Sequence, residues 1–131
     1  MKVILVNGSP HEKGCTYTAL TEIQKTLEKN KIETEIFWVG NKPISGCLGC
    51  GNCIKTGKCF MEDKVNEFLE KVPEADGFVF GTPVHFASGS GMITSFMDRA
   101  FYGICFQELR YGTSQVQGYG SGVCGCTQGV V

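Results

Sequence analysis

The chain has 131 residues, of which 42% are hydrophobic and 11% are aromatic. This is enough apolar material for one core but not for two independent domains, so the sequence predicts a single domain. Twelve Lys and Arg residues stand against 13 Asp and Glu residues, and no segment gathers basic side chains. A nucleic-acid partner is therefore not expected.

The beginning of the chain lacks the features of an export signal. Only four apolar residues, 3–6, precede Asn7-Gly8, whereas a secretory signal has an apolar segment of about 7 to 15 residues. No apolar stretch approaches the roughly 20 residues that span a bilayer. We expect a cytoplasmic protein with no membrane partner, in which the eight cysteines do something other than form stable disulfides.

Apolar runs alternate with helical periodicity along the N-terminal part of the chain. Residues 3–6 form a continuous apolar run before a Gly-rich turn, which is typical of a parallel strand buried on both faces. Apolar residues then recur at helical spacing over 17–27 and predict a helix, with Asn30 at its expected C-cap. Residues 36–39 form a second apolar run and predict a second strand.

The same alternation continues after a loop rich in glycine and cysteine, residues 40–60. Residues 65–72 predict a second helix that ends at Pro73. Residues 77–81 predict a third strand, and 92–101 predict a third helix with a broad apolar face. Strands and helices that alternate at these lengths form parallel βαβ units with right-handed crossovers, so the sequence predicts an open α/β sheet.

The turn after the first predicted strand, residues 8–16, has the composition of an anion site. A helix N-terminus offers unpaired backbone N–H groups and a partial positive charge. Gly8 and Gly14 allow the backbone to approach a phosphate closely. The hydroxyls of Ser9 and Thr16 can donate to the phosphate oxygens. The terminal phosphate of FMN suits this chemistry.

Spacing excludes two other phosphate motifs in this turn. The Walker pattern requires Gly-Lys followed by Ser or Thr, and the dinucleotide fingerprint requires three glycines as G-x-G-x-x-G. Neither pattern occurs between the first strand and the first helix. A loop that only connects a strand to a helix is the remaining alternative.

Gly8-Ser9-Pro10 after a first strand, followed by Gly14-Cys15-Thr16 at the start of a helix, resembles the phosphate loop of the NADPH-dependent FMN reductases. The resemblance implies an α/β fold of the flavodoxin-like class, a doubly wound parallel sheet. The residues that it implies for binding FMN in this turn are Ser9, His11, Gly14, Cys15 and Thr16.

A second stretch, residues 81–91, is similar to the loop after the third strand in the same group, where it lies along the isoalloxazine ring. Ligands of doubly wound sheets bind beyond the carboxyl ends of the strands, at the switch in strand order. The family more often has tyrosine at His85, and a histidine that only packs on the surface is an alternative. The implied flavin contacts are Thr82, Pro83, Val84, His85 and Phe86.

Four cysteines form the compact spacing C-x2-C-x2-C-x5-C, interleaved with glycines: Cys47, Cys50, Cys53 and Cys59. Thiolates this close together can bind one metal centre, and glycines let backbone N–H groups point at sulfide. The spacing differs from the ferredoxin run, which has three residues before a Cys-Pro pair. It is similar to the motif of the iron-sulfur flavoproteins, in which four cysteines bind one 4Fe-4S cluster near the flavin and near the subunit interface.

Two alternatives stay open for this motif. Structural zinc sites commonly combine two separated C-x2-4-C pairs, and four reduced thiols without metal are the third interpretation. The other cysteines look incidental as thiols, although Cys124-Gly125-Cys126 can bind adventitious metal. They are Cys15, Cys105, Cys124 and Cys126.

The pattern of strands and helices fails from residue 103 onward, where Arg110 is the last charged residue and glycines recur. A flavodoxin-like sheet has five strands, and three are identified. We therefore interpret residues 1–102, with the cysteine loop 46–60, as the N-terminal part of an FMN-binding domain that is incomplete at its C-terminus. Residues 103–131 stay unassigned, and a truncation or a frame error is the expected cause.

Together these motifs predict an FMN-dependent NAD(P)H oxidoreductase that accepts a hydride at flavin N5 and passes electrons through a 4Fe-4S cluster. The expected acceptor is ferredoxin or a small molecule. No acid-base pair is identified, so no catalytic side chain is predicted. A non-enzymatic flavin electron carrier and an inactive fragment are the alternatives, and the resemblance implies a homodimer or homotetramer.

Overall fold

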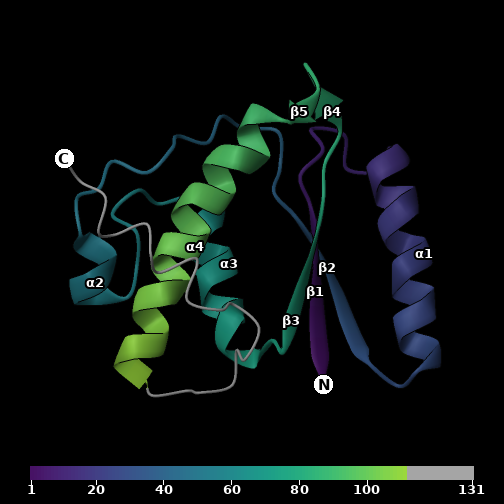
Figure 1. Ribbon diagram of the computed structural model, residues 1–131, viewed down its shortest axis with the longest axis horizontal. Helices are drawn as coiled ribbons and strands as arrows, with labels where there is room; N and C mark the ends of the chain where they lie inside the picture. The colour runs from purple at the N-terminus through teal and green to yellow at the C-terminus, as the bar shows by residue number, and fades with distance from the viewer. Residues whose placement is uncertain (112–131) are drawn as a thin grey trace.

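Three parallel strands lie at the centre of the computed structural model, which describes residues 1–111 and the side chains of 1–105 (Figure 1). Strand β1 (Lys2–Asn7) lies between β2 (Glu33–Trp38) and β3 (Gly77–Gly81). Both neighbours pair with β1 in parallel. The order β2-β1-β3 confirms the predicted α/β class with a parallel, flavodoxin-like sheet, because each crossover passes through a helix.

Helices cover both faces of this sheet (Figure 1). Helix α1 (Cys15–Lys29) lies on one face, and α3 (Lys64–Lys71) and α4 (Gly91–Tyr111) lie on the other. A short 3-10 turn, η1 (Val72–Glu74), follows α3 and contains Pro73. The result is a three-layered arrangement in which the central strand contacts helices on both sides.

The main core lies between the sheet and the α3–α4 layer. Ile4 and Val6 belong to this core, whereas Leu5 points to the opposite face, where Leu20 of α1 is buried. Phe68 of α3 is fully buried and is surrounded by the rings of four phenylalanines, with centroid distances of 5.2 to 6.4 Å. The four are Phe37, Phe78, Phe80 and Phe96.

Most predicted elements occur where the periodicity placed them. The first helix has Asn30 as its C-cap, as expected. The third strand covers the predicted residues 77–81. These elements could be read from the sequence because each depends on its own local pattern of apolar residues.

The last helix is longer than predicted. Helix α4 continues from the expected end near residue 101 to Tyr111, so the segment expected to be irregular from Gly103 begins as helix. Gly103 is buried against α3, where an added Cβ would lie 2.9 Å from Cδ1 of Leu69. This glycine therefore permits a close approach of two helices and does not end one. The predictions for residues 112–131 lie outside the described residues.

Two short elements were not anticipated from the sequence. Helix α2 (Asn52–Thr56) lies inside the cysteine loop. Strands β4 (Val84–His85) and β5 (Ser88–Gly89) form an antiparallel hairpin in the loop after β3. Both are too short to show a period. Within the described part of the chain, no helix is long and apolar enough to cross a membrane.

Candidate functional site

The turn between β1 and α1 is organised by the side chain of Asn7, which is fully buried. Its Oδ1 accepts a hydrogen bond from the backbone N–H of Ser9 at 3.1 Å, and its Nδ2 donates to the carbonyl of Glu12 at 2.9 Å. Asn7 thus ties the first and last parts of the turn together. The prediction from sequence missed it, although a polar residue at the end of a buried strand is a usable signal.

Ser9 is buried and fixes the turn against β2. Its carbonyl accepts from Nε1 of Trp38 at 2.9 Å. Its Oγ accepts from the backbone N–H of His11 at 3.1 Å, which leaves the hydroxyl hydrogen free to donate. His11 itself is exposed at the rim of the turn. The predicted role of Ser9 as a phosphate donor stays a prediction that this geometry allows.

The N-terminus of α1 is uncapped. Gly14 is the N-cap residue and carries no side chain that could accept from the first N–H groups, and the first turn contains no acidic residue. Cys15 is exposed and Thr16 is partly exposed at this end. The unpaired N–H groups and the helix dipole therefore remain available to an anion.

The turn of residues 8–16, called the phosphate turn after its predicted role, lies directly against the loop after β3. The N–H of Gly8 donates to the carbonyl of Gly81 at 2.8 Å. A Cβ on Gly8 would lie 2.7 Å from the side chain of Ile93, and one on Gly81 would lie 2.9 Å from Cγ2 of Thr16. A side chain at either crossing point would force its neighbours to shift, so glycine lets the two predicted cofactor loops meet at the carboxyl edge of the sheet.

Ser90 joins the two loops and is almost completely buried. Its hydroxyl donates to the carbonyl of Gly8 and accepts from the N–H of Ile93, both at 3.3 Å, so that it also caps α4. Its backbone N–H donates to Oγ1 of Thr82 at 3.1 Å. Ser90 was not among the predicted site residues, because its partner Gly8 is 82 residues away in the sequence.

The β4–β5 hairpin projects from this site beside the start of α4 (Figure 1). Its two turn residues, Phe86 and Ala87, have φ angles of 52° and 59°. This is the conformation of a type I′ turn, which normally carries glycine or asparagine and strains other residues. Phe86 is fully exposed, and Val84 and His85 are exposed beside it, whereas Pro83 is partly buried. Phe86 therefore does not belong to the core.

All four cysteines of the motif line one hollow beside α4, together with the side chain of Arg99. The enclosed space between these side chains is small, about 20 Å³. Within residues 1–105, however, no three side chains of the types that ligate metals are close enough together to hold a single ion. The thiols therefore surround a common space without converging on one point.

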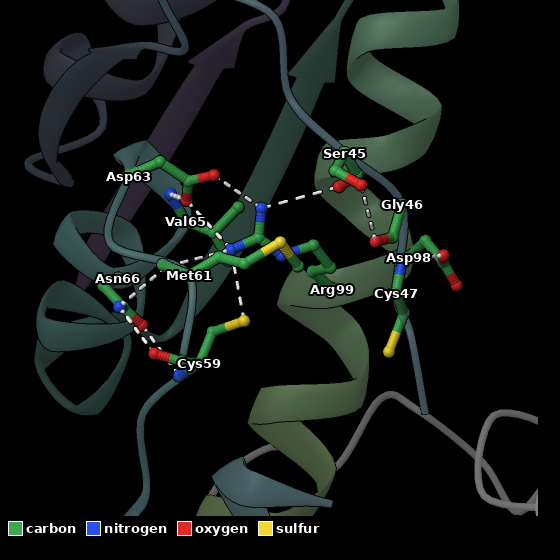
Figure 2. A network of polar contacts seen from close by, with 10 residues as sticks. All are labelled: Ser45, Gly46, Cys47, Cys59, Met61, Asp63, Val65, Asn66, Asp98 and Arg99. Atoms are coloured by element: carbon green, nitrogen blue, oxygen red, sulfur yellow. Dashed lines mark hydrogen bonds and ion pairs between the residues drawn. The ribbon is translucent and has the colours of Figure 1, made fainter. Parts of the chain in front are cut away.

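Two contacts hold the ends of the cysteine motif to α4 (Figure 2). The backbone N–H of Cys47 donates to Oδ2 of Asp98 at 2.7 Å. Nη2 of Arg99 donates to Sγ of Cys59 at 3.1 Å. Asn66 of α3 holds the backbone of Cys59 from the other side, through its Oδ1 at 2.8 Å and its Nδ2 at 2.9 Å.

The surroundings disfavour the charged form of the Cys53 thiol but favour the charged form of Arg99. Burial raises the pKa of the Cys53 thiol, and the neighbouring Cys47 and Cys59 raise it further. Burial alone would lower the pKa of Arg99, but its hydrogen bonds to Asp63 and Cys59 outweigh burial and raise it. The guanidinium therefore stays positively charged beside the thiols.

Comparison with known proteins identifies the family of this chain. Residues 1–126 match the family model of the NADPH-dependent FMN reductases. The chain belongs to this family. The match extends beyond residue 102, where the resemblance read from the motifs stopped. The phosphate turn, the loop after β3 and the flavodoxin-like sheet are thus features of a family member.

The similar curated proteins that align with this chain include three iron-sulfur flavoproteins. One from Methanocaldococcus jannaschii is 39% identical over 100 residues, which cover 76% of this chain and 52% of the relative. One from Archaeoglobus fulgidus is 36% identical over 76% of this chain and 49% of its own length. One from Clostridioides difficile is 35% identical, with 76% and 46% covered. The chain thus spans about half the length of these relatives.

Proposed function

We propose that this chain binds FMN and acts as a flavin-dependent NAD(P)H oxidoreductase that passes electrons through a 4Fe-4S cluster. The observation that carries the proposal is the arrangement of both sites on one helix. Ser90, at the start of α4, ties together the two predicted flavin loops. Arg99, nine residues further along the same helix, contacts the last cysteine of the motif. Nine residues advance a helix by about 13 Å.

The turn at β1 and α1 fits the phosphate of FMN. It combines an uncapped helix N-terminus, a buried serine whose hydroxyl hydrogen is free to donate, and a glycine that is packed too closely for any side chain. An anionic phosphate uses the unpaired N–H groups and the serine hydroxyl, while the glycine lets the two loops pack together. The exposed hairpin at Phe86 lies beside the same edge of the sheet and fits the isoalloxazine ring, which needs an apolar surface to cover it.

The hollow beside α4 fits an iron-sulfur cluster better than zinc. A tetrahedral zinc site requires four ligands at about 2.3 Å from one ion, whereas a four-iron cluster distributes its four thiolates over four metals and keeps them further apart. The thiols line one space without forming a single-ion site among the described residues. The buried cation beside Cys59 also suits an anionic cluster with its thiolates.

The bound cofactors supply hydride and electron transfer. The residues of this chain bind and orient them. The turn from Gly8 to Thr16 holds the phosphate end of the flavin, and the loop from Thr82 to Phe86 positions its ring. The four cysteines hold the cluster, while α4 keeps the two sites at a constant separation. No side chain of the chain is assigned a nucleophilic or acid-base role.

The proposed function also includes a reductant, an electron acceptor, a location and an oligomeric state. NADH or NADPH is the expected reductant, and ferredoxin or a small molecule is the expected acceptor. A cytoplasmic location and assembly into a homodimer or homotetramer also stay predictions. The non-enzymatic flavin carrier remains the alternative, and it differs by failing to oxidise NAD(P)H.

An anaerobic absorption spectrum with iron and acid-labile sulfide assays tests the proposal. We expect flavin bands at about 375 and 450 nm, a broad shoulder between them and about four irons per chain. Cys53→Ser should lose most of the iron while the flavin bands remain, and Cys105→Ser, outside the motif, should keep both. Flavin without iron would reduce the proposal to a simple FMN reductase, and a colourless protein would refute it.

A further inference from the structure

Arg99 is the buried cation of the cysteine site (Figure 2). Its side chain is 1% exposed. It lines the hollow that the four cysteines surround. A charged side chain in such a position needs partners for its charge and for each of its donors.

One end of the guanidinium is fully occupied. Nη1 and Nη2 form a bidentate pair with the carboxylate of Asp63 at 2.5 and 3.0 Å. Nη2 also donates to Sγ of Cys59 at 3.1 Å and to the carbonyl of Met61 at 3.2 Å, and Nη1 reaches the carbonyl of Ser45 at 3.5 Å. These contacts join the two sides of the cysteine loop to α4.

The remaining donor, Nε, has no acceptor among the residues that the structure describes. Nε of Arg99 is buried and has no hydrogen-bond partner. No other buried side-chain nitrogen or oxygen of the described residues lacks one. Buried donors in folded proteins are almost always satisfied, so an unpaired one points to a missing acceptor. Arg99 also lines the hollow, so a group held there would lie beside this side chain.

The residue before Arg99 holds the opposite end of the motif. Asp98 accepts the backbone N–H of Cys47, the first cysteine, at 2.7 Å. Arg99 donates to the sulfur of Cys59, the last cysteine. Two adjacent residues on one rigid helix therefore determine how far apart the first and last ligands lie.

We propose that Asp98 and Arg99 are the positioning residues of the cysteine site, and that Arg99 also sets the reduction potential of the group held there by donating to its sulfur atoms. This inference depends on the proposed cluster and adds to it two residues outside the cysteine motif. Reduction adds one negative charge to a cluster, and hydrogen bonds and positive charges near its sulfurs favour the reduced form. Arg99 therefore raises the potential, and the carboxylate of Asp63 opposes it.

The test is a redox titration of the cluster by electron paramagnetic resonance in two variants of opposite sign. Arg99→Gln removes the positive charge and should shift the reduction equilibrium about tenfold toward the oxidised form, which is ~59 mV for one electron. Asp63→Asn leaves the arginine charge uncompensated, retains a good N-cap for α3, and should shift the equilibrium in the opposite direction. A merely structural role would not produce shifts of opposite sign.

Lys58→Met is the matched control. Lys58 is adjacent to Cys59 in the sequence, but its ammonium is exposed and pairs with Glu70 on the surface. Solvent screens such a charge. The reduction equilibrium should therefore change by no more than about twofold, which corresponds to a shift of ~18 mV in the potential. If Arg99→Gln shifts the potential no more than Lys58→Met does, the role of Arg99 is refuted.

A second measurement uses the protein without metal. In Asp98→Asn, hydrogen exchange of the Cys47 amide should accelerate about tenfold or more, because a neutral amide accepts the bond less strongly than a carboxylate. Asp76→Asn is the control, since Asp76 also accepts a backbone N–H at 2.7 Å but from Lys2, far from the motif. Unchanged exchange at Cys47 would refute the role of Asp98.

The outcomes separate this inference from the proposed function. If the unmodified protein binds about four irons and Asp63→Asn and Arg99→Gln leave its potential unchanged, the cluster stands and only the inference fails. If the unmodified protein takes up no iron and sulfide, the proposed cluster fails and the potential-setting role of Arg99 fails with it.

Discussion

Single hydroxyl and amide groups decide how the two predicted flavin loops meet. Ser90 contributes one hydroxyl that links the phosphate turn to the N-terminus of α4, and Asn7 contributes one amide that closes the turn itself. Both side chains are buried, so each hydrogen bond that is lost leaves an unsatisfied group. The geometry of the site therefore depends on two buried polar residues, Ser90 and Asn7, that were not among the residues predicted to bind a cofactor.

Replacing Ser90 should weaken both the fold and the flavin site. Ser90→Ala removes the cap of α4 and the bond to Gly8, and we expect a loss of about 1 to 2 kcal/mol in the free energy of unfolding. FMN affinity should fall as the two loops separate. Urea unfolding and a flavin titration measure the two effects. Ser88→Ala, at an exposed position of the same hairpin, should change neither, and an equal effect of both variants would contradict the role of Ser90.

Packing between elements explains why α4 extends through a glycine. At Gly103 an added Cβ would lie 2.9 and 3.0 Å from the two methyl groups of Leu69, which is buried in α3. At Gly91, at the start of the same helix, the same addition meets nothing within 4 Å. The two glycines therefore differ in function although both lie in one helix.

Alanine substitutions should separate these two glycines. Gly103→Ala gains up to about 1 kcal/mol of helix propensity but overpacks the α3–α4 contact, which costs about 1 to 3 kcal/mol. We expect a net loss of stability at Gly103 and no loss at Gly91, where only the propensity changes. Thermal unfolding of the two variants tests this, and a Gly103→Ala protein as stable as Gly91→Ala would show that the helices do not touch there.

Ion pairs that join β2 to β1 and α3 make stability depend on pH. Glu35 of β2 pairs with Lys71 of α3 at 2.6 Å and with Lys2 of β1 at 3.5 Å. The hydrogen bond from Lys71 is the largest cause that lowers the pKa of Glu35. A lowered pKa in the folded state contributes stability above the unfolded pKa, about 4.3, and this contribution is lost as the pH falls through the folded value.

Glu35→Gln should therefore destabilise the protein near neutral pH and have little effect in acid. The side chain is 32% exposed, so we expect only about 0.5 to 1 kcal/mol at pH 7, decreasing toward zero below pH ~4. Urea unfolding at several pH values measures the difference. Glu33→Gln, exposed at the start of the same strand, is the control. A difference that persists unchanged at low pH would contradict the ion-pair explanation.

The molecule as a whole gathers its candidate sites around the carboxyl edge of the sheet and the helix that begins there. The phosphate turn follows β1, the hairpin follows β3, and α4 leads from the hairpin to the cysteine hollow (Figure 1). A ligand that contacts both loops joins segments far apart in sequence. Binding of such a ligand stabilises the folded state as a whole.

FMN should consequently raise the unfolding temperature more than riboflavin does. At a concentration 100 times its dissociation constant, a ligand adds about 2.7 kcal/mol to the free energy of unfolding. Riboflavin has the same ring but lacks the phosphate, so it cannot use the uncapped end of α1. Thermal unfolding with equal concentrations of each flavin tests this. Equal shifts would show that the turn does not anchor the phosphate.

The sequence by itself determined the three strands of the main sheet, the helices that pack on them, the two loop motifs and the cysteine spacing, but not the short α2 helix or the β4–β5 hairpin. Each of these is a local pattern, in which a run of apolar residues or a fixed spacing specifies backbone geometry without reference to distant residues. The same local patterns predicted an open parallel α/β sheet, and the resemblance of the loop motifs implied the flavodoxin-like class. They could not identify Ser90 or Arg99, and they misread Gly103 as the start of an irregular segment.

Only the tertiary structure decided how these motifs meet. The bond from Ser90 to Gly8 spans 82 residues, and the contact from Arg99 to Cys59 spans 40. Likewise, the close packing at Gly103 involves Leu69 on another helix. Such contacts form when strands and helices pack, because burial then forces each polar group to find a partner and each backbone to fit its neighbour. A pattern along the chain contains no information about which distant residue that neighbour is.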